Sequence, residues 1–265
     1  MAKKQEVSET WRSILAGTID TGRKKRHLFS LIPSDPRCRF CNAPFFGVGA
    51  PLMRTIFRKR PSKLNPRFCN VCDDFVTHHL GGAEIELTML FADVRGSTAL
   101  AEKSNPLDFT RLMNRFYAAT MNVLAKTDAW TDKIVGDEVI GLYIPGFAGP
   151  DHARVAIEAA KEILRTTGHD REEGPWLPVG IGVHTGVAFV GTVGSEEGIT
   201  NVTALGDAMN ITARLVARAA AGEILASEDA CKAAGPEYLQ APRRQLKLRG
   251  RKNPVAVRIL RIASA

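Results

Sequence analysis

Several stretches after residue 82 have the hydrophobic pattern of β-strands. Residues 84–91 alternate at first and then become continuously apolar, which predicts a strand that becomes fully buried. The β-rich runs 130–135 and 139–144 flank Gly136-Asp137, and this spacing predicts a β-hairpin. Further strands are expected over 177–194, as a hairpin turning at His184-Thr185-Gly186, over 223–227, and over 245–260 as a closing hairpin.

Apolar residues three and four positions apart predict amphipathic helices over 106–126, 152–166 and 207–219. A short helix is also expected within residues 1–30 and another over 50–60. Strands and helices therefore alternate, with hairpins between them. This order predicts an α+β or α/β sandwich whose sheet is covered on one face.

Charge divides the 265-residue chain into two parts. The net charge is +8, but residues 1–80 carry 15 Lys and Arg against 6 Asp and Glu, a balance of +9 that leaves −1 for the rest. Gly81-Gly82 is the expected hinge between this basic module, residues 1–80, and the domain that follows. We expect the module to meet an acidic partner: nucleic acid, an anionic membrane face or an acidic protein surface.

The pattern also bears on location. No apolar run is long enough to cross a bilayer, and the first residues lack the apolar core of a signal peptide. We therefore expect no transmembrane segment and a cytoplasmic protein.

Four of the five cysteines form two CxxC pairs, Cys38/Cys41 and Cys69/Cys72, with 27 residues between the pairs. Two such turns can place four thiolates around one metal ion. A module with a small hydrophobic core needs such a bound metal for stability. Structural Zn²⁺ is the first choice. A 4Fe–4S cluster uses the same four thiolates and is the alternative, with unliganded buried thiols third.

The helix expected over 50–60 has an apolar side and a basic side. Leu52, Met53, Ile56 and Phe57 are apolar, whereas Arg54, Arg58, Lys59 and Arg60 are basic and expected in solvent. We expect the apolar side to pack inward on the cysteine site. The alternative is that the helix lies on an anionic surface.

Two acidic turns carry the candidate chemistry. Asp93 falls where strand 84–91 ends, and Gly96-Ser97-Thr98 opens a helix whose free backbone N–H groups can take phosphate. Asp137 lies in the turn of the first hairpin. If the strands are neighbours, both carboxylates point to one end of the sheet. Two aspartates, phosphates and divalent ions make a phosphoryl-transfer site of the two-metal kind.

A second group of polar residues lies on the helix expected over 207–219. Asn210 and Arg214 are four residues apart, so an amide and a guanidinium can reach one ligand together. On its own this pair is more typical of a surface hydrogen bond than of a ligand site. The basic turn 249–252 of the closing hairpin could approach a polyphosphate, whereas His184 is expected to satisfy backbone groups in its turn.

Four ordered blocks resemble the catalytic domain of class III nucleotidyl cyclases over about residues 83–262. They are Phe91–Gly96, Lys133–Glu138, Gly182–Gly186 and Leu205–Arg214. The cysteine module resembles a region joined to such domains in some bacterial proteins. The resemblance implies an α/β sandwich with a ferredoxin-like core and a homodimer with active sites at its interface.

The resemblance also implies roles for individual residues. Asp93 and Asp137 would bind two Mg²⁺ or Mn²⁺ ions, helped by the Val94 carbonyl. Asn210 would orient the ribose and Arg214 would meet the charge that builds on the α-phosphate. The closing turn lies where the family often has a phosphate-contacting lysine, which makes Lys252 a candidate for substrate binding.

Base selection in the family rests on two positions, here Lys133 and Thr203. A lysine ammonium can donate to the adenine N1 acceptor but would face the N1–H donor of guanine, so the pair predicts ATP as the substrate. The expected activity is adenylyl cyclase, giving 3′,5′-cyclic AMP and pyrophosphate. The alternatives are a guanylyl cyclase, a redox-gated cyclase, or a non-catalytic nucleotide sensor whose metal module binds nucleic acid.

Overall fold

The computed structural model describes residues 2–18, 20–32, 36–63, 65–193, 201–251 and 253–263. The chain forms two compact units. The first unit comprises Met1–Ile85 and Phe189–Ala204, and the second comprises Glu86–Ala188 and Leu205–Ala265.

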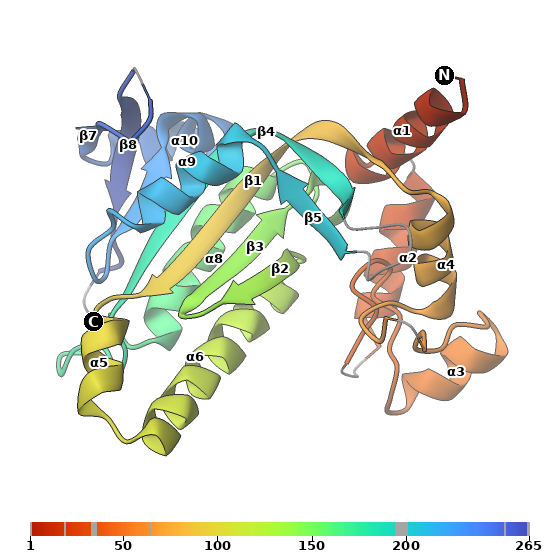
Figure 1. Ribbon diagram of the computed structural model, residues 1–265, viewed down its shortest axis with the longest axis horizontal. Coiled ribbons are helices and arrows are strands. Elements are labelled where there is room, and N and C mark those ends of the chain that lie inside the picture. Colours follow the sequence, from red (N-terminus) through yellow and green to blue (C-terminus); the bar gives the residue numbers. More distant parts are fainter. Residues whose placement is uncertain are drawn as a thin grey trace. The chain divides into compact units, whose positions relative to one another are not determined.

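One mixed β-sheet organises the fold (Figure 1). Its strands are β1 (Gly82–Val94), β2 (Trp130–Val135), β3 (Glu138–Tyr143), β4 (Val179–Val193), β5 (Asn201–Leu205), β6 (Ile224–Ser227), β7 (Arg243–Leu246) and β8 (Val255–Leu260). The strand order is β2-β3-β1-β4-β6-β8-β7, with β5 paired to β4. The pairs β1/β3 and β2/β3 are antiparallel, as the predicted hairpin requires, whereas β4 and β6 are parallel.

Helices cover the sheet of the second unit. They are α5 (Ser97–Lys103), α6 (Pro106–Lys126), α7 (Pro145–Ala148), α8 (His152–Thr166), α9 (Asp207–Val216), α10 (Glu228–Ala234) and the 3₁₀ turn η1 (Pro236–Gln240). The predicted limits of α6 and α8 are confirmed. Asn105 caps α6 by accepting a hydrogen bond from the Leu107 N–H, and Pro106 occupies the first turn, where its missing N–H costs nothing.

The apolar stripes of α6, α8 and α10 form the main core with one face of the sheet. This core contains Phe116, Ile163 and Cys231 from the helices and Leu90 from β1. Strand periodicity separates it from a smaller core on the other face. Ile224 and Ala226 of β6 point into the main core, whereas Leu225 packs with Leu215 of α9. The predicted α+β fold class is confirmed, with helices on both faces rather than one.

The hairpin predicted over 177–194 is wrong, because β4 is one continuous strand. The glycines in this run do not turn the chain. A Cβ on Gly182 would lie 2.6 Å from the backbone nitrogen of Val216, so glycine lets α9 approach the sheet closely. His184 therefore lies inside a strand, not in a turn, and its Nδ1 is 2.8 Å from the Ser227 Oγ. Ser227 also caps α10 by accepting a hydrogen bond from the Ala230 N–H.

The first unit contains α1 (Ala2–Leu15), α2 (Asp20–Ser30), α3 (Gly49–Thr55) and α4 (Asn70–His78). Two helices therefore replace the single one predicted within residues 1–30. Trp11 is fully buried, packs against Phe75 with ring centroids 5.3 Å apart and donates its indole N–H to the His79 carbonyl. Arg26 of α2 is also buried and donates to the carbonyls of Arg39 and Phe40. Its charge is thus used inside the unit.

The inward packing predicted for the helix over 50–60 is largely wrong. Met53 is buried, but Leu52, Ile56 and Phe57 are all exposed. The helix is also shorter than predicted, because α3 ends at Thr55. None of the described helices has the length and apolar character needed to cross a bilayer.

The buried His184 makes the stability of the second unit depend on pH. Burial lowers the pKa of His184 from 6.5 to about 4. Between these pH values the unfolded chain binds a proton that the folded chain does not. The free energy of unfolding should therefore fall as pH drops from about 6.5 to 4, by roughly 3 kcal/mol from this residue.

Urea unfolding at pH 7 and near pH 4 measures this loss. His184→Gln should lose less stability over this interval than the unmodified chain does, by roughly the same 3 kcal/mol. His27→Gln, which changes an exposed histidine of α2, is the control and should keep the full dependence. Equal pH dependence in His184→Gln and the unmodified chain would contradict the assignment.

Candidate active site and cysteine cluster

Three carboxylates meet where β1 and β3 end. Asp93 is the last but one residue of β1 and pairs in register with Glu138, the first residue of β3. Asp137 precedes Glu138 in the turn, and its carbonyl accepts a hydrogen bond of 3.3 Å from the Val94 N–H. Asp93 was predicted to follow the strand, but it lies within it. The strand ladder therefore fixes its position next to the turn that carries Asp137.

Burial and mutual repulsion act on these acids. Burial raises the pKa of Asp93, the Arg95 guanidinium lowers it, and Asp137 raises it again, so that the net shift is upward. Burial, followed by the charges of Asp93 and Asp137, raises the pKa of Glu138 to about 7. The three carboxylates thus repel one another at the edge of the sheet. Arg95, which forms an ion pair with Asp93, is a neighbouring cation to which sequence reasoning assigned no role.

A tight turn places hydroxyl groups beside these acids. Gly96 has φ +71°, a left-handed conformation that glycine adopts without strain, and it begins α5. Ser97 donates its hydroxyl hydrogen to the Asp137 carboxylate, and Thr98 is exposed in the same turn. Tyr117 of α6 donates its hydroxyl to the Gly136 carbonyl at 2.6 Å and so fixes the other side of the turn. Sequence reasoning missed Tyr117 because its helical spacing assigned it to the core.

Lys133 lies on β2, the edge strand beside β3. A register irregularity between Thr131 and Lys133 exposes Lys133 while Asp132 stays buried. The Lys133 ammonium is 3.5 Å from an Asp132 carboxylate oxygen, and its charge also lowers the pKa of Glu138 against the larger effects that raise it. Lys133 is therefore near the acid group. Thr203 is a half-buried residue of β5 and belongs to the first unit.

The second predicted group lies on α9. Asn210 is exposed and Arg214, one turn later, is half-buried. The closing turn lies over this helix: a Cβ on Gly250 would be 3.7 Å from an Arg214 guanidinium nitrogen, and Arg251 forms an ion pair with Asp207. Arg251 was not singled out from the sequence. Lys252, the predicted lysine of this turn, lies outside the described residues.

The two groups remain separate in one chain. Across the described ranges, no hydrogen bond or ion pair joins Asp93, Asp137 or Ser97 to Asn210 or Arg214. A single copy thus presents an acidic half-site and a basic half-site. Each is positioned by its own elements of the second unit.

The chemistry of the acidic half-site fits divalent cations. Asp93 and Asp137 offer carboxylate oxygens, which Mg²⁺ and Mn²⁺ prefer, and the Val94 carbonyl lies in the adjacent backbone. Burial raises the pKa of Asp93 and of Glu138, and the neighbouring acids raise both further. A dication bound here would favour the ionised forms of these acids.

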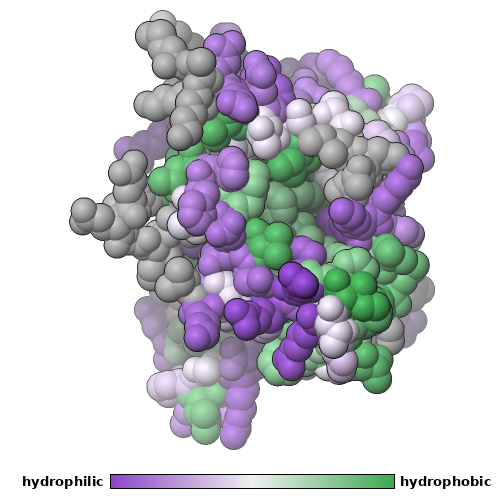
Figure 2. All heavy atoms as spheres, turned by 90° about the vertical axis from the view of Figure 1, so that its right-hand side faces the viewer, coloured by the Kyte–Doolittle hydropathy of each residue, from purple (hydrophilic) through white to green (hydrophobic). Residues whose placement is uncertain are grey.

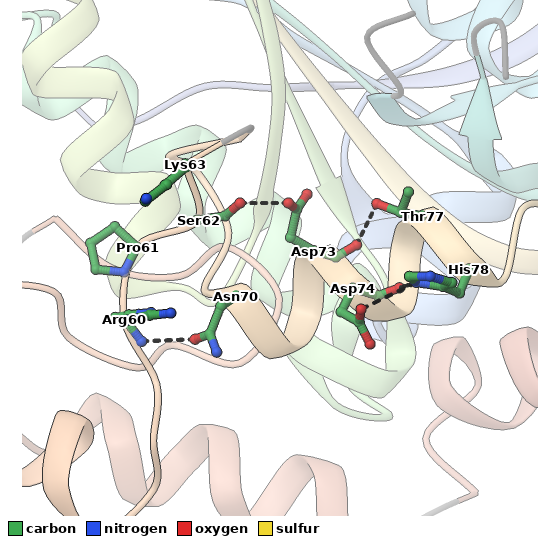
Figure 3. Close-up of a pocket in the computed structure, with 9 residues that line it drawn as sticks. All are labelled: Arg60, Pro61, Ser62, Lys63, Asn70, Asp73, Asp74, Thr77 and His78. Atoms are coloured by element: carbon green, nitrogen blue, oxygen red, sulfur yellow. Dashed lines mark hydrogen bonds and ion pairs between the residues drawn. The ribbon is translucent and has the colours of Figure 1, made fainter. Parts of the chain in front are cut away.

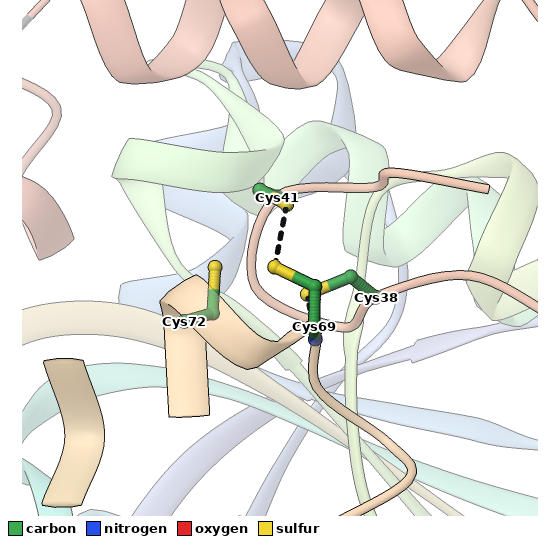
Figure 4. A group of neighbouring side chains, drawn as sticks. All are labelled: Cys38, Cys41, Cys69 and Cys72. Carbon is green, nitrogen blue, oxygen red and sulfur yellow. Dashed lines mark hydrogen bonds between the residues drawn. The ribbon is translucent and has the colours of Figure 1, made fainter. Parts of the chain in front are cut away.

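The four cysteines of the two CxxC pairs converge in the first unit (Figure 4). Their sulfur atoms all lie within 4.8 Å of one another, and the Cys41 and Cys69 sulfurs are 3.8 Å apart. Cys38 and Cys41 lie on a turn closed by the Asn42 N–H on the Cys38 carbonyl, whereas Cys69 caps α4 and Cys72 lies in its first turn. This geometry fits one metal ion with four thiolate ligands.

Charge around the cluster favours thiolates. The N-terminus of α4 favours negative charge on Cys69 and Cys72. The Lys59 ammonium lies 3.7 Å from the Cys69 sulfur. Burial lowers the pKa of Lys59, but the cysteine charges outweigh it and leave that pKa raised. Burial also raises the pKa of Cys38, so the four groups cannot all ionise without a cation among them.

An open surface pocket of about 210 Å³ lies beside α4 (Figure 3). Its lining carries both signs of charge, from Arg60 and Lys63 and from Asp73 and Asp74. Ser62 donates to Asp73 at 2.5 Å, and His78 pairs with Asp74 at 3.2 Å. These polar groups already bind one another, so the pocket has none of the uniform charge of an anion or cation site.

Comparison with known proteins connects this geometry to a family. Residues 83–260 match the model of the adenylate and guanylate cyclase catalytic domain. The adenylate cyclase of Anabaena cylindrica is 30% identical over 133 residues, which are 49% of this chain and 26% of that protein. An uncharacterized protein of Mycobacterium tuberculosis is 32% identical over 182 residues, 66% of this chain and 32% of that protein. The chain thus spans about a quarter to a third of these relatives.

Solved structures agree with the family model. The guanylyl cyclase Cya2 superposes with a TM-score of 0.62 and 27% identity, covering 70% of this chain and 96% of that one. The adenylyl cyclase CyaB from P. aeruginosa shares the fold, with a TM-score of 0.57, 24% identity and coverage of 68% and 95%. The chain therefore belongs to the family of adenylate and guanylate cyclase catalytic domains.

Proposed function

We propose that the chain is an adenylyl cyclase, which converts ATP to 3′,5′-cyclic AMP and pyrophosphate. The observation that carries the proposal is the placement of Asp93, Asp137 and Ser97 at one end of the sheet, with Lys133 on the neighbouring strand. The acids that would hold metal ions and the lysine that would recognise the base thus lie at the same end of the sheet. The family assignment supplies the reaction class.

Two Mg²⁺ or Mn²⁺ ions would be held by Asp93, Asp137 and the Val94 carbonyl. When bound, they acidify the ribose 3′-hydroxyl and neutralise the triphosphate. The turn Gly96-Ser97-Thr98 would offer backbone N–H groups to phosphate oxygens. Ser97 also holds the Asp137 carboxylate in place.

The basic half-site would act on the rest of the nucleotide. Asn210 would hydrogen-bond the ribose and fix the 3′-oxygen in line with the α-phosphate. Arg214 would donate to the phosphate oxygens as negative charge builds on them in the transition state. Lys252 and the adjacent Arg251, which is anchored on Asp207, would bind the departing pyrophosphate.

Lys133 and Thr203 would select adenine. An ammonium at Lys133 donates to adenine N1, whereas guanine presents an N1–H donor there, and a buried donor facing a donor is costly. The buried Asp132 carboxylate, 3.5 Å from the Lys133 ammonium, would help to hold that side chain in position. A guanylyl cyclase is the second candidate, because the guanylyl cyclase Cya2 is 27% identical to this chain.

A homodimer would join the two half-sites. Since one chain leaves the acids of the sheet edge unconnected to α9, a head-to-tail pair would set the acidic half-site of one copy against the basic half-site of the other. Exposed Ile134 and Val135 on β2 and Leu205 on β5 are apolar positions that such an interface would cover. Each dimer would then hold two identical sites.

The cysteine module, residues 1–80, would hold Zn²⁺ and regulate or locate the catalytic domain, residues 83–262. Zn–S bonds of about 2.3 Å place the sulfurs of a tetrahedral site about 3.8 Å apart. The Cys41–Cys69 separation is 3.8 Å. In a 4Fe–4S cluster each thiolate binds a different iron, which separates the sulfurs further, so the spacing favours one ion. Reduced thiolates and ATP both fit a cytoplasmic protein.

Incubation of the purified chain with ATP or GTP and Mn²⁺ tests the base assignment. Cyclic AMP should be the main product, and Lys133→Glu should lower kcat/KM for ATP by at least about 100-fold because it replaces the donor with an acceptor. Lys232→Glu, an exposed change on α10, should leave it unchanged. Cyclic GMP as the main product would establish the guanylyl cyclase instead. ATP bound but not converted would support a nucleotide sensor.

Mixing two inactive variants tests the shared site. Asp93→Ala and Arg214→Ala should each lower kcat by at least about 1000-fold. A mixed dimer has one site with both changes and one intact site. Random mixing should therefore restore about a quarter of the activity, since about half of the dimers are mixed. No recovery from a confirmed mixed dimer would contradict the arrangement.

Metal analysis tests the cysteine site. The chain should contain one zinc, and Cys72→Ser should lose it and lower the melting temperature of the first unit, because four-coordinate zinc contributes directly to folding. Cys231→Ser is the matched control: this buried cysteine of α10 lies in the other unit, and burial raises its pKa to about 12. It should keep the zinc. If the protein purified without air were brown and contained iron, the site would hold an iron–sulfur cluster instead of zinc.

A further inference from the structure

The α3 helix exposes apolar residues on one side. Val48, Leu52 and Ile56 are four residues apart, all with helical backbone at or next to α3, so they form one stripe, which we call the α3 stripe. Their exposed fractions are 82%, 42% and 66%. Gly49 and Met53 face inward instead, and a Cβ on Gly49 would overlap the Ile32 side chain at 2.3 Å. The inward side therefore fixes the stripe in an outward orientation.

Only positive charge surrounds the α3 stripe in the sequence. Residues 36–72 contain eight Lys and Arg and no Asp or Glu. Arg54 and Arg58 are exposed next to the stripe, and among the described residues neither forms an ion pair. Figure 2, which faces the first unit, shows hydrophobic surface beside strongly hydrophilic side chains. An exposed apolar stripe among unbalanced cations matches a surface that is apolar inside and negatively charged outside.

The cysteine cluster holds this segment in place. Lys59 donates its N–H to the Met53 carbonyl at 2.8 Å, and its ammonium points at the Cys69 sulfur. Pro61 then pairs with Cys69 in an isolated bridge. The chain that leaves α3 is thus tied to the cysteines within a few residues. The α3 stripe is a rigid projection rather than a disordered tail, which lowers the entropy lost when it binds.

We propose that the α3 stripe, with Arg54 and Arg58, docks the protein on the surface of an anionic lipid bilayer. Val48, Leu52 and Ile56 would enter the boundary between headgroups and acyl chains, and the two arginines would bind lipid phosphates. Nucleic acid fits less well, because aliphatic side chains do not stack on bases. An acidic protein fits less well, because the stripe faces outward as a ridge without a groove. The proposal extends the proposed function by naming where cyclic nucleotide would be made.

Co-sedimentation with vesicles tests the proposal on the intact, zinc-loaded chain. Vesicles that mix phosphatidylglycerol with phosphatidylcholine should bind the protein at least about tenfold more tightly than pure phosphatidylcholine, and added salt should weaken this binding. Val48→Asp should lower the affinity by at least about tenfold. Val48 precedes the first residue of α3 and is 82% exposed, and negative charge at a helix N-terminus is favourable, so this change should keep the helix. Arg54→Gln with Arg58→Gln should also weaken binding.

Two matched variants control for general effects. Leu107→Asp places an aspartate in the first turn of α6, at a 58% exposed leucine of the other unit, and should bind vesicles normally. Arg171→Gln with Lys232→Gln removes two exposed charges from the second unit and should do the same. Cyclase activity without vesicles should be equal in all of these variants. The lipid result and the enzymatic result can therefore fail independently.

Three outcomes would overturn the proposal. The first is no binding of the unmodified chain to anionic vesicles. The second is binding that Val48→Asp leaves unchanged. The third is a different occupant of the stripe. In that case the protein would not bind vesicles, and Val48→Asp would abolish its binding to duplex DNA or dissociate a dimer in gel filtration.

Discussion

The crowding of three carboxylates where β1 and β3 end is the constraint on which the arrangement of the candidate active site depends. The β1/β3 ladder sets Asp93 opposite Glu138, and the turn adds Asp137 to the same edge. Burial raises the pKa of Asp93 and of Glu138, and the neighbouring acids raise both further. Acids crowded in this way are typical of functional sites, because replacing one of them would relieve the repulsion. The surroundings hold the acids together with Ser97, Arg95 and a glycine turn.

The arginine of α9 lies apart from these acids. Asp93 pairs with Arg95 of its own turn, and within the described residues no hydrogen bond or ion pair joins it to Arg214. Instead α9 carries Arg214 on the face away from the main core, under a closing turn that Asp207 anchors through Arg251. Under the proposed function, a triphosphate with its cations would complete both half-sites at once, which is the differential binding that catalysis requires.

The sequence predicts elements best where local pattern and tertiary role agree. Apolar residues recur every three or four positions in α6 and α8, and the β2/β3 hairpin turns at Gly136-Asp137. The limits of these elements are therefore predicted closely. The β4 strand was misread because glycines are typical of turns, whereas Gly182 serves the close approach of α9, a contact that no local pattern contains. The relation of Thr203 to Lys133 is equally non-local. Their joint role remains a prediction from family resemblance.

The α3 helix shows a different limit of sequence reasoning. An amphipathic pattern indicates that one side seeks an apolar environment, but it does not say that the environment lies inside the same chain. In this small unit, which contains the cluster of four cysteines, Gly49 and Met53 already fill the space under the helix. Ile56, which follows the last residue of α3, is left 66% exposed. The stripe therefore stays outside, where only another surface can cover it.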